Sequence, residues 1–306
     1  MSEKIIKIGT RDSELALWQA HAVQQKINDL GVKTEIISVK SQGDLQLNKP
    51  LYELGITGIF TKTLDIAMIN GTIDIAVHSM KDVPTALPIG VIQGAVLERA
   101  TANDILIHKN NLDFLQHTGT VATGSLRRQA QWLNKYPAHT VVDLRGNVNL
   151  RMAKLNQNNW NGAIFAAAGL ERLNLKPDHY INLDWMTPAP AQGAMVVLTM
   201  ANDNFCNEVV NELNHLESDI CTYIERQFLR KLEGGCTAPI GAFCKIIDDD
   251  IYFKGNLLSI DGSQKIEVEK TVRLQDWKKL GFNLATEILQ NGGEQLMKSI
   301  KQTLNK

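Results

Sequence analysis

One thiol, Cys236, lies in a sequence that presents it instead of burying it. Gly234 and Gly235 precede it, and Pro239 follows three residues later. Glycine and proline favour tight, exposed turns, and here they follow a helix-like segment over 223–232. A thiol on such a turn is placed to form a covalent bond with a ligand. The sequence therefore predicts an attachment site for an organic group at Cys236.

Arginines recur where predicted strands give way to helices. Four such turns begin at Gly9, Thr123, Leu144 and Ala168. Helix N-termini carry unpaired N–H groups and partial positive charge, and a guanidinium matches a carboxylate with two hydrogen bonds. In open α/β sheets these turns gather at the carboxyl ends of the strands. A ligand with several carboxylates or phosphates is indicated by five arginines: Arg11, Arg127, Arg128, Arg145 and Arg151.

Simpler interpretations exist for several of these residues. Ser13, Ser125 and Asn147 are suited to cap helices, and each alone would be read that way. Arg127 and Arg128 point about 100° apart on a helix, so one could line a cleft while the other pairs with a surface acid. A nucleotide is disfavoured, because the sequence has neither a Gly-x-Gly-x-x-Gly fingerprint nor a Walker loop.

A second reactive stretch follows the apolar segment 73–77. It carries Lys81 and Asp82, which would serve an anion and a developing cation in a functional site. The alternative is an ordinary surface ion pair, and His78 is given no role. Asp44 and Gln192 are equally suited to turns and to a polar cleft. No paired His, Cys or Asp spacing indicates a metal site.

The composition is that of an ordinary globular protein. The 306 residues are 44% hydrophobic and 21% charged, and the formal net charge of −1 gives no general attraction to nucleic acid or membrane. The N-terminus lacks the pattern of a secretory signal, and no apolar run reaches membrane-spanning length. The four cysteines show no C-x-x-C spacing and are expected to be reduced thiols in a cytoplasmic protein.

Hydrophobic periodicity predicts two consecutive α/β units and a smaller α+β domain. Crossings between the first two are expected near 98–103 and 187–192, the latter rich in Pro and Ala. Strands are predicted over 4–9, 34–39, 73–77, 105–107, 120–122, 140–144, 162–166, 242–247, 251–258 and 265–274. Helices are predicted over 13–30, 58–70, 126–136, 148–156 and 277–290, with a largely helical stretch over 203–232.

Five motifs, in order along nearly the whole chain, resemble the porphobilinogen deaminase family: 77–84, 125–128, 144–147, 191–194 and 233–236. The resemblance implies two α/β lobes similar to type II periplasmic binding proteins, plus a small α+β C-terminal domain. The implied boundaries are 1–98 with 194–215 for the first lobe, 99–193 for the second, and 216–306 for the domain that carries the cofactor.

The resemblance also implies a transferase of haem and other tetrapyrrole biosynthesis. Its cofactor would be a dipyrromethane joined by a thioether to Cys236. Four porphobilinogen units would be added head to tail with loss of ammonia, and the linear hydroxymethylbilane would be released by hydrolysis. A cytoplasmic monomer is expected, with porphobilinogen as its small-molecule partner and with no nucleic acid, membrane or metal.

Residue roles follow from the same resemblance. Asp82 would stabilise the cation formed on the substrate pyrrole as ammonia leaves. The cofactor contacts are expected at Lys81, Thr123, Ser125, Arg127, Arg128 and Arg145. The substrate contacts are expected at Arg11, Ser13, Arg145, Arg151, Arg172 and Gln192.

Some positions depart from the family pattern. Gln42 stands where a basic residue is common, Thr57 where a lysine is common, and Gly124 where a serine is common. The first two fall in 41–60, an expected mobile lid, and affect its contacts and not the reaction type. Two other classes stay open. A solute-binding protein would give Cys236 no purpose, and a thiol-dependent transferase would need a histidine base near it.

Overall fold

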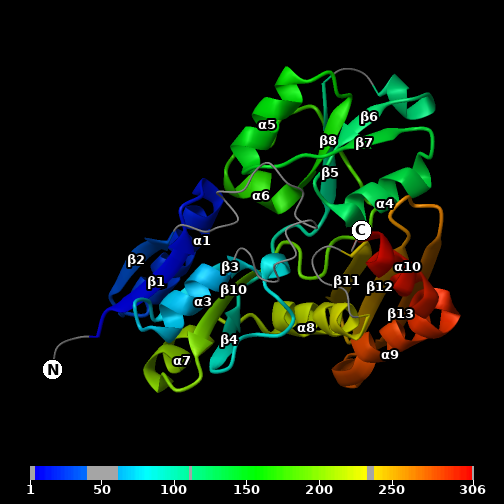
Figure 1. Cartoon of the computed structure of the whole chain (residues 1–306). Helices are drawn as coiled ribbons and strands as arrows, with labels where there is room; N and C mark the ends of the chain where they lie inside the picture. Colours follow the sequence, from blue (N-terminus) through cyan, green and yellow to red (C-terminus); the bar gives the residue numbers. More distant parts are fainter. Residues whose placement is uncertain (1–3, 40–60, 110–111, 233–237, 305–306) are drawn as a thin grey trace. The chain divides into compact units, whose positions relative to one another are not determined.

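The computed structural model describes residues 4–39, 61–109, 112–232 and 238–304. These residues form two compact units, drawn in Figure 1. The first unit holds the described residues up to Ala100 together with Gly193–Asp219. The second holds Thr101–Gln192 and the described residues from Ile220 onward. The expected lid over 41–60, with Gln42, Asp44 and Thr57, lies outside the described residues, as does Cys236.

The first unit is built on a five-stranded sheet with the order β2-β1-β3-β10-β4. Strand β1 is parallel to β2 and β3, whereas β10 is antiparallel to both β3 and β4. The strands are β1 Ile6–Arg11, β2 Thr34–Val39, β3 Ile75–Ser79, β4 Val91–Val96 and β10 Met195–Met200. The helices are α1 Glu14–Asp29, α3 Lys62–Ile69, the short η2 Met80–Asp82, and α7 Asn204–Asn211.

The second unit contains a sheet with the same plan, in the order β7-β6-β8-β5-β9. Here β6 is parallel to β7 and β8, and β5 is antiparallel to β8 and β9. The strands are β5 Asp104–His108, β6 Thr120–Ala122, β7 Thr140–Val142, β8 Gly162–Ala166 and β9 Tyr180–Asn182. The helices are η3 Asp113–Gln116, α4 Leu126–Lys135, α5 Val148–Gln157 and α6 Ala167–Arg172.

The antiparallel strand of each sheet is the one that follows a crossing. Strand β5 enters the second sheet just after the crossing near 98–103, and β10 returns to the first sheet just after the crossing near 187–193. The segment after the second crossing therefore pairs with strands that lie more than a hundred residues earlier, as between Met195 and Ser79.

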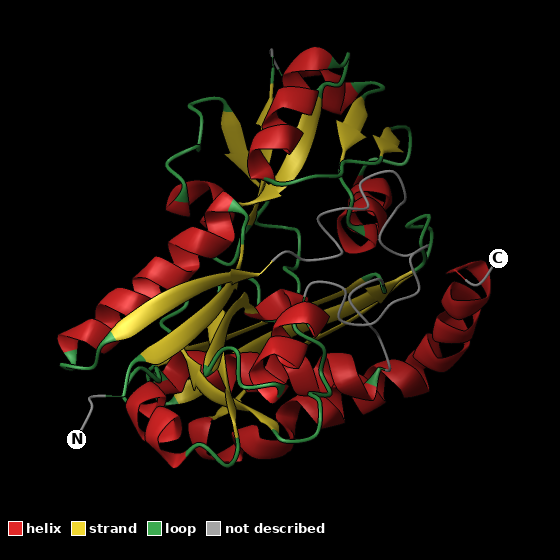
Figure 2. Cartoon of the chain, turned by 60° about the vertical axis from the view of Figure 1, so that its left-hand side comes forward, coloured by secondary structure: helices red, strands yellow, loops and turns green. Residues whose placement is uncertain are grey.

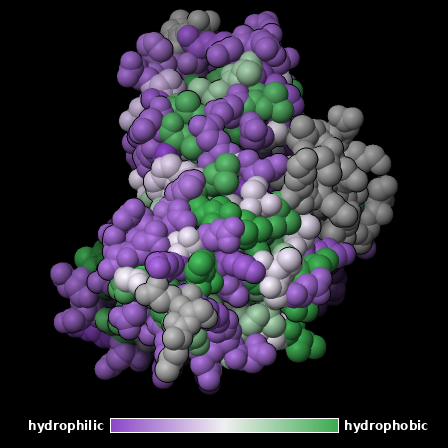
Figure 3. All heavy atoms as spheres, turned by 90° about the vertical axis from the view of Figure 1, so that its left-hand side faces the viewer, coloured by the Kyte–Doolittle hydropathy of each residue, from purple (hydrophilic) through white to green (hydrophobic). Residues whose placement is uncertain are grey.

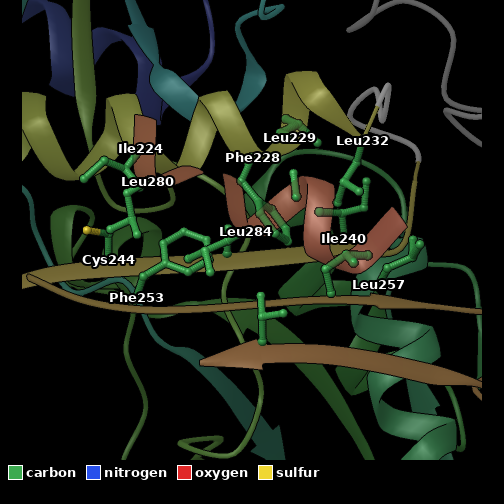
Figure 4. Packing of buried hydrophobic residues seen from close by; sticks show 14 of the residues in the cluster. Ile224, Phe228, Leu229, Leu232, Ile240, Cys244, Phe253, Leu257, Leu280 and Leu284 are labelled. Carbon is green, nitrogen blue, oxygen red and sulfur yellow. The ribbon is translucent and has the colours of Figure 1, made fainter. Parts of the chain in front are cut away.

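The C-terminal part of the second unit is an antiparallel sheet, β11-β12-β13, packed against helices. Figure 4 shows Ile224 and Phe228 of α8 packed over Phe253 of β12 and Leu284 of α9. The strands are β11 Ile240–Ile247, β12 Asp250–Leu258 and β13 Lys265–Arg273. The helical segments are α8 Leu216–Lys231, η4 Leu274–Lys279, α9 Leu280–Ile288, η5 Leu289–Gly293 and α10 Glu294–Leu304.

The predicted fold class is confirmed as two α/β sheets with flanking helices plus a small α+β part, as Figure 2 shows. Central strands such as β3 and β8 are buried on both faces, which explains their continuous apolar runs. Three predicted strands have the observed bounds: 34–39, 120–122 and 162–166.

Several elements differ from the prediction. The sequence predicts no strand at the positions of β4, β9 and β10. In β4 the apolar pattern is interrupted by Gln93 and Gly94. The predicted last helix was expected to end at 291–293. Instead the chain bends there, with Gly292 at φ 98°, and continues as α10. Glycine allows this conformation without the clash a Cβ would cause.

Candidate active site

The carboxyl ends of three parallel strands meet at one edge of the second sheet. Strands β6, β7 and β8 end there, and helices α4, α5 and α6 begin within a few residues. Asp104, the first residue of β5, lies opposite Ala166 at the end of β8, so its carboxylate joins the same edge. This is the edge at which open α/β sheets bind ligands.

The helices at this edge begin with capping side chains, as the simpler interpretation expected. Ser125 Oγ accepts from the Arg128 N–H at 3.5 Å, and Asn147 Oδ1 accepts from the Leu150 N–H at 2.9 Å. In the first unit, Ser13 Oγ accepts from the Ala16 N–H at 3.4 Å. A serine hydroxyl that accepts in this way still has its own hydrogen to donate to a carboxylate.

Arg127 and Arg128 both pair with the buried Asp104. Arg127 Nη1 lies 2.7 Å from Oδ2, and Arg128 Nη2 lies 2.8 Å from Oδ1. Burial alone would raise the pKa of Asp104, but the two guanidinium charges outweigh it and hold that pKa well below its usual range. Both arginines therefore pair with a buried acid and not with a surface one. Together Asp104, Arg127 and Arg128 carry a net charge of +1.

Arg145 follows β7 and is only 5% exposed. Its Nε and Nη1 are buried and have no hydrogen-bond partner among the residues that the structure describes. Burial lowers the pKa of Arg145, opposed by the charge of Asp143. Burying guanidinium N–H groups without hydrogen-bond partners costs free energy, so this position favours the binding of an anion.

Two cations of α5 support the turn that carries Arg145. Arg151 Nε donates to the Gly146 carbonyl at 2.7 Å, and Lys154 Nζ donates to the Arg145 carbonyl at 3.1 Å. Gly146 itself has φ 113°, a conformation that favours glycine. Sequence reasoning missed Lys154, although its spacing of three residues from Arg151 places both on one helix face.

The prediction of a fourth polar turn, beginning at Ala168, is wrong. Strand β8 runs directly into α6, so Ala168 lies inside the helix and Arg172 is its last residue. Arg172 is half-buried, and burial lowers its pKa against the opposing charge of Glu171. It remains near the carboxyl edge of the sheet, but at the far end of a short helix.

Thr123 and Gln192 are buried polar residues of this unit. Thr123 Oγ1 accepts from the Ser125 N–H at 3.3 Å. Gln192 is 1% exposed, and its Nε2 donates to the Ala102 carbonyl at 2.7 Å and to Asp104 Oδ1 at 2.9 Å. Both amide hydrogens of Gln192 are thus used within the chain, which leaves it no donor for a carboxylate ligand.

In the first unit, a second group of predicted site residues lies at the carboxyl ends of the parallel strands β1 and β3. Strand β1 ends at Arg11, the adjacent β3 ends at Ser79, and η2 carries Lys81 and Asp82 directly after it. Both Lys81 and Asp82 are half-buried. Within the described ranges, no side chain donates a hydrogen bond to the Asp82 carboxylate. That carboxylate is therefore available to an N–H of a ligand.

His78 precedes this set and is buried. Burial, together with the charge of Arg11, lowers the pKa of His78 to about 4. The ring is therefore neutral near pH 7. Met80 is 1% exposed and packs in the core, as expected.

The other cysteines differ from the expected role of Cys236. Cys206, Cys221 and Cys244 are all free and buried. Burial, with the nearby Asp203, raises the pKa of Cys206 to about 12, so its thiol is unreactive. Across the described residues, no group of three or more His, Cys, Asp or Glu side chains could hold a metal ion, and no helix is long and apolar enough to cross a membrane.

Two family models together match most of the chain. The porphobilinogen deaminase dipyromethane cofactor binding domain matches residues 6–208, and the porphobilinogen deaminase C-terminal domain matches residues 220–290. Among curated relatives, porphobilinogen deaminase of Carboxydothermus hydrogenoformans is 36% identical, covering 99% of both chains. That of Chlorobium phaeobacteroides is also 36% identical, covering 99% of this chain and all of the relative.

Solved structures give weaker likenesses. The VFT2 domain of BvgS from Bordetella pertussis matches with a TM-score of 0.43 and 13% identity, over 68% of this chain and 86% of that domain. The substrate binding protein of an amino acid ABC transporter matches with a TM-score of 0.38 and 14% identity, over 69% and 91% of the two chains.

Proposed function

The chain belongs to the porphobilinogen deaminase family, and we infer that it joins four porphobilinogen units head to tail, with loss of ammonia, and releases hydroxymethylbilane. It is a transferase of tetrapyrrole and haem biosynthesis. Its cofactor is a dipyrromethane, and the family model for most of its length is named for binding that group. We propose that Cys236 anchors the cofactor as a thioether and takes no part in each turnover.

The observation that carries this proposal is that Nε and Nη1 of the buried Arg145 have no hydrogen-bond partner among the described residues. Each pyrrole unit bears an acetate and a propionate, so the primer and the growing chain are polycarboxylates. Arg145 supplies buried N–H groups without partners in the described chain, and the Asp104 group adds one uncompensated positive charge at the same sheet edge. Carboxylates of the primer would accept hydrogen bonds from Arg145 and would neutralise the excess charge of the Asp104 group.

Residue roles can be assigned on this basis. We assign the primer carboxylates to Lys81, Thr123, Ser125, Arg127, Arg128 and Arg145. When bound, the primer supplies the pyrrole carbon to which units are added. We assign the substrate carboxylates to Arg11, Ser13, Arg145, Arg151 and Arg172. Gln192 is left out of this set, because its amide hydrogens are donated to Ala102 and Asp104.

Asp82 acts on the substrate pyrrole. When the pyrrole nitrogen expels ammonia, positive charge develops on the ring and its N–H becomes a stronger donor. A fixed carboxylate beside that N–H stabilises the charge more in the transition state than in the bound substrate, which lowers the barrier. The absence of a donor to Asp82 among the described side chains supports this role.

The remaining expectations are also part of the proposal. We propose a cytoplasmic monomer that binds no nucleic acid, with lobes 1–98 plus 194–215 and 99–193, and a cofactor-carrying domain 216–306. A net charge of −1 supports the absence of nucleic acid binding. Polar side chains cover much of the face drawn in Figure 3, and hydrophobic ones gather mainly across its middle.

Turnover of porphobilinogen by purified protein tests the function. The wild-type chain should release ammonia and a linear tetrapyrrole, and Arg145→Met should lose most of this activity. Arg273→Met is the matched control, since it removes an arginine whose side chain is 67% exposed. Absence of turnover in the wild type would refute the function. Equal turnover in both variants would remove Arg145 from the site.

A further inference from the structure

We propose that Asp104 is a positioning residue for this reaction, one that fixes the two guanidiniums offered to the carboxylates of the primer. The inference deepens the proposed function and rests on it. Asp104 has no motif around it, and it does not belong to any of the strand-to-helix turns. Its carboxylate is nevertheless fully buried and contacts three of the side chains that the sequence marked as site residues.

The contacts divide between the two carboxylate oxygens. Oδ2 meets Arg127 Nη1 at 2.7 Å. Oδ1 receives Arg128 Nε at 2.9 Å and Nη2 at 2.8 Å. Backbone carbonyls add to these contacts. Arg127 Nη1 also donates to Thr187 at 2.8 Å, and a further nitrogen of Arg128, Nη1, donates to Ile164 at 3.1 Å. The planar guanidinium of Arg128 is thus fixed through all three of its nitrogens, and that of Arg127 through Nη1.

Charge explains why a carboxylate is needed here. Arg127 and Arg128 are adjacent and both buried, so without Asp104 two like charges would face each other in a medium of low polarity. With Asp104 present, its negative charge offsets this repulsion, and one net positive charge remains for a ligand. Arg127 Nε is buried and has no hydrogen-bond partner in the part of the chain that the structure describes.

Gln192 extends this arrangement to the crossing segments. Its amide group joins Asp104 Oδ1 to the Ala102 carbonyl, and Gln192 itself lies just before the second crossing returns to the first sheet. The segment after the first crossing and the segment before the second are therefore linked through the same carboxylate that holds the arginines. Gln192 is thereby assigned to support Asp104 and not to contact substrate.

The test compares Asp104→Asn with Asp104→Glu and with a control, Asp178→Asn, which removes an exposed carboxylate of the same unit. The fraction of chains that carry the primer is measured by intact mass. Turnover with porphobilinogen is then expressed per primer-bearing chain. We expect Asp104→Asn to lower kcat by roughly tenfold to a hundredfold, because a misplaced primer seldom reaches the reactive geometry. We expect a smaller change in KM, partial recovery in Asp104→Glu, and wild-type values in Asp178→Asn.

A purely structural role gives a different result. In that case Asp104→Asn would lower the thermal midpoint while kcat per primer-bearing chain stayed within about twofold of wild type, and the inference would be overturned. If Asp104→Asn does not fold, Gln192→Met answers the question, because it keeps the acid and both arginines. A several-fold lower kcat in Gln192→Met supports the inference, and a wild-type kcat rejects it. Failure of the proposed function itself is recognised separately, as a wild-type protein without primer or turnover.

Discussion

Gly124 lies against the carbonyl oxygen of Leu144, so closely that a Cβ atom at Gly124 would stand 2.6 Å from that oxygen. The two residues belong to the turns after β6 and β7, which are neighbours in the second sheet. One turn carries Ser125 and the other carries Arg145. The missing side chain therefore lets two turns that we propose to bind anions approach more closely than a serine, common in the family at this position, would permit.

Restoring the common residue should harm this particular chain. Gly124→Ser is expected to lower the free energy of unfolding by about 1–3 kcal/mol, because the added atom meets backbone that cannot rotate away. Gly124→Ala carries the same Cβ without the hydroxyl and should lose a similar amount. Denaturant unfolding of both variants checks this. Wild-type stability in either would show that the turns separate at little cost.

Arg145 should have opposite effects on stability and on activity. In a primer-free background, Cys236→Ala, replacement by methionine removes a buried charge whose Nε and Nη1 lack hydrogen-bond partners among the described residues. Arg145→Met is then expected to raise the free energy of unfolding by about 1–3 kcal/mol. In the chain with Cys236 intact, the same substitution should reduce turnover. Denaturant unfolding of the primer-free variants and turnover of the Cys236 variants check these two effects. A less stable primer-free Arg145→Met variant would mean that Arg145 has a partner within the protein.

His78 should make stability depend on pH. Its pKa is lowered from an ordinary value of 6.5 to about 4 by burial and by Arg11. Between these values the unfolded chain binds a proton that the folded chain does not, so stability is lost as the pH falls from about 6.5 toward 4. Thermal midpoints across this range should fall more steeply for the wild type than for His78→Gln. The exposed His21→Gln should follow the wild type, and identical slopes for all three would show that His78 keeps its ordinary pKa.

Asp82→Asn should separate primer attachment from turnover. The amide keeps the shape of the side chain but cannot stabilise a cation on the substrate pyrrole. We expect the variant to carry the primer and to lose roughly a hundredfold to ten-thousandfold in kcat. Asp29→Asn, an exposed position of the same unit, should behave as wild type. Wild-type turnover by Asp82→Asn would remove this carboxylate from the mechanism.

Much of the fold could be predicted from the sequence, because strands buried on both faces and amphipathic helices carry distinct periodicities. The turns after β1, β3, β6 and β7 were predicted for the same reason, since apolar runs end there in polar segments. Pairing across the chain could not be predicted in this way. Strand β10 lies beside β3 and β4 only in three dimensions, and its own residues form an apolar run without a helical or alternating pattern.

The site residues, like the strands, could be predicted only where the sequence carries a local pattern. Arg127, Arg128 and Arg145 stood out because several arginines recur at similar turns. Asp104 did not, because it begins an ordinary apolar strand and its partners lie 24 residues away at Arg128 and 88 residues away at Gln192. A buried ion pair between distant segments leaves no local pattern in a sequence. The use of both amide hydrogens of Gln192 was likewise invisible without the structure.

The central claim is that a two-pyrrole primer is held covalently by Cys236. The mass of the intact, freshly purified protein tests this most directly. The account predicts a chain heavier than its sequence by one dipyrromethane, and a Cys236→Ala chain at the sequence mass without activity. Active protein at the bare sequence mass would contradict the account.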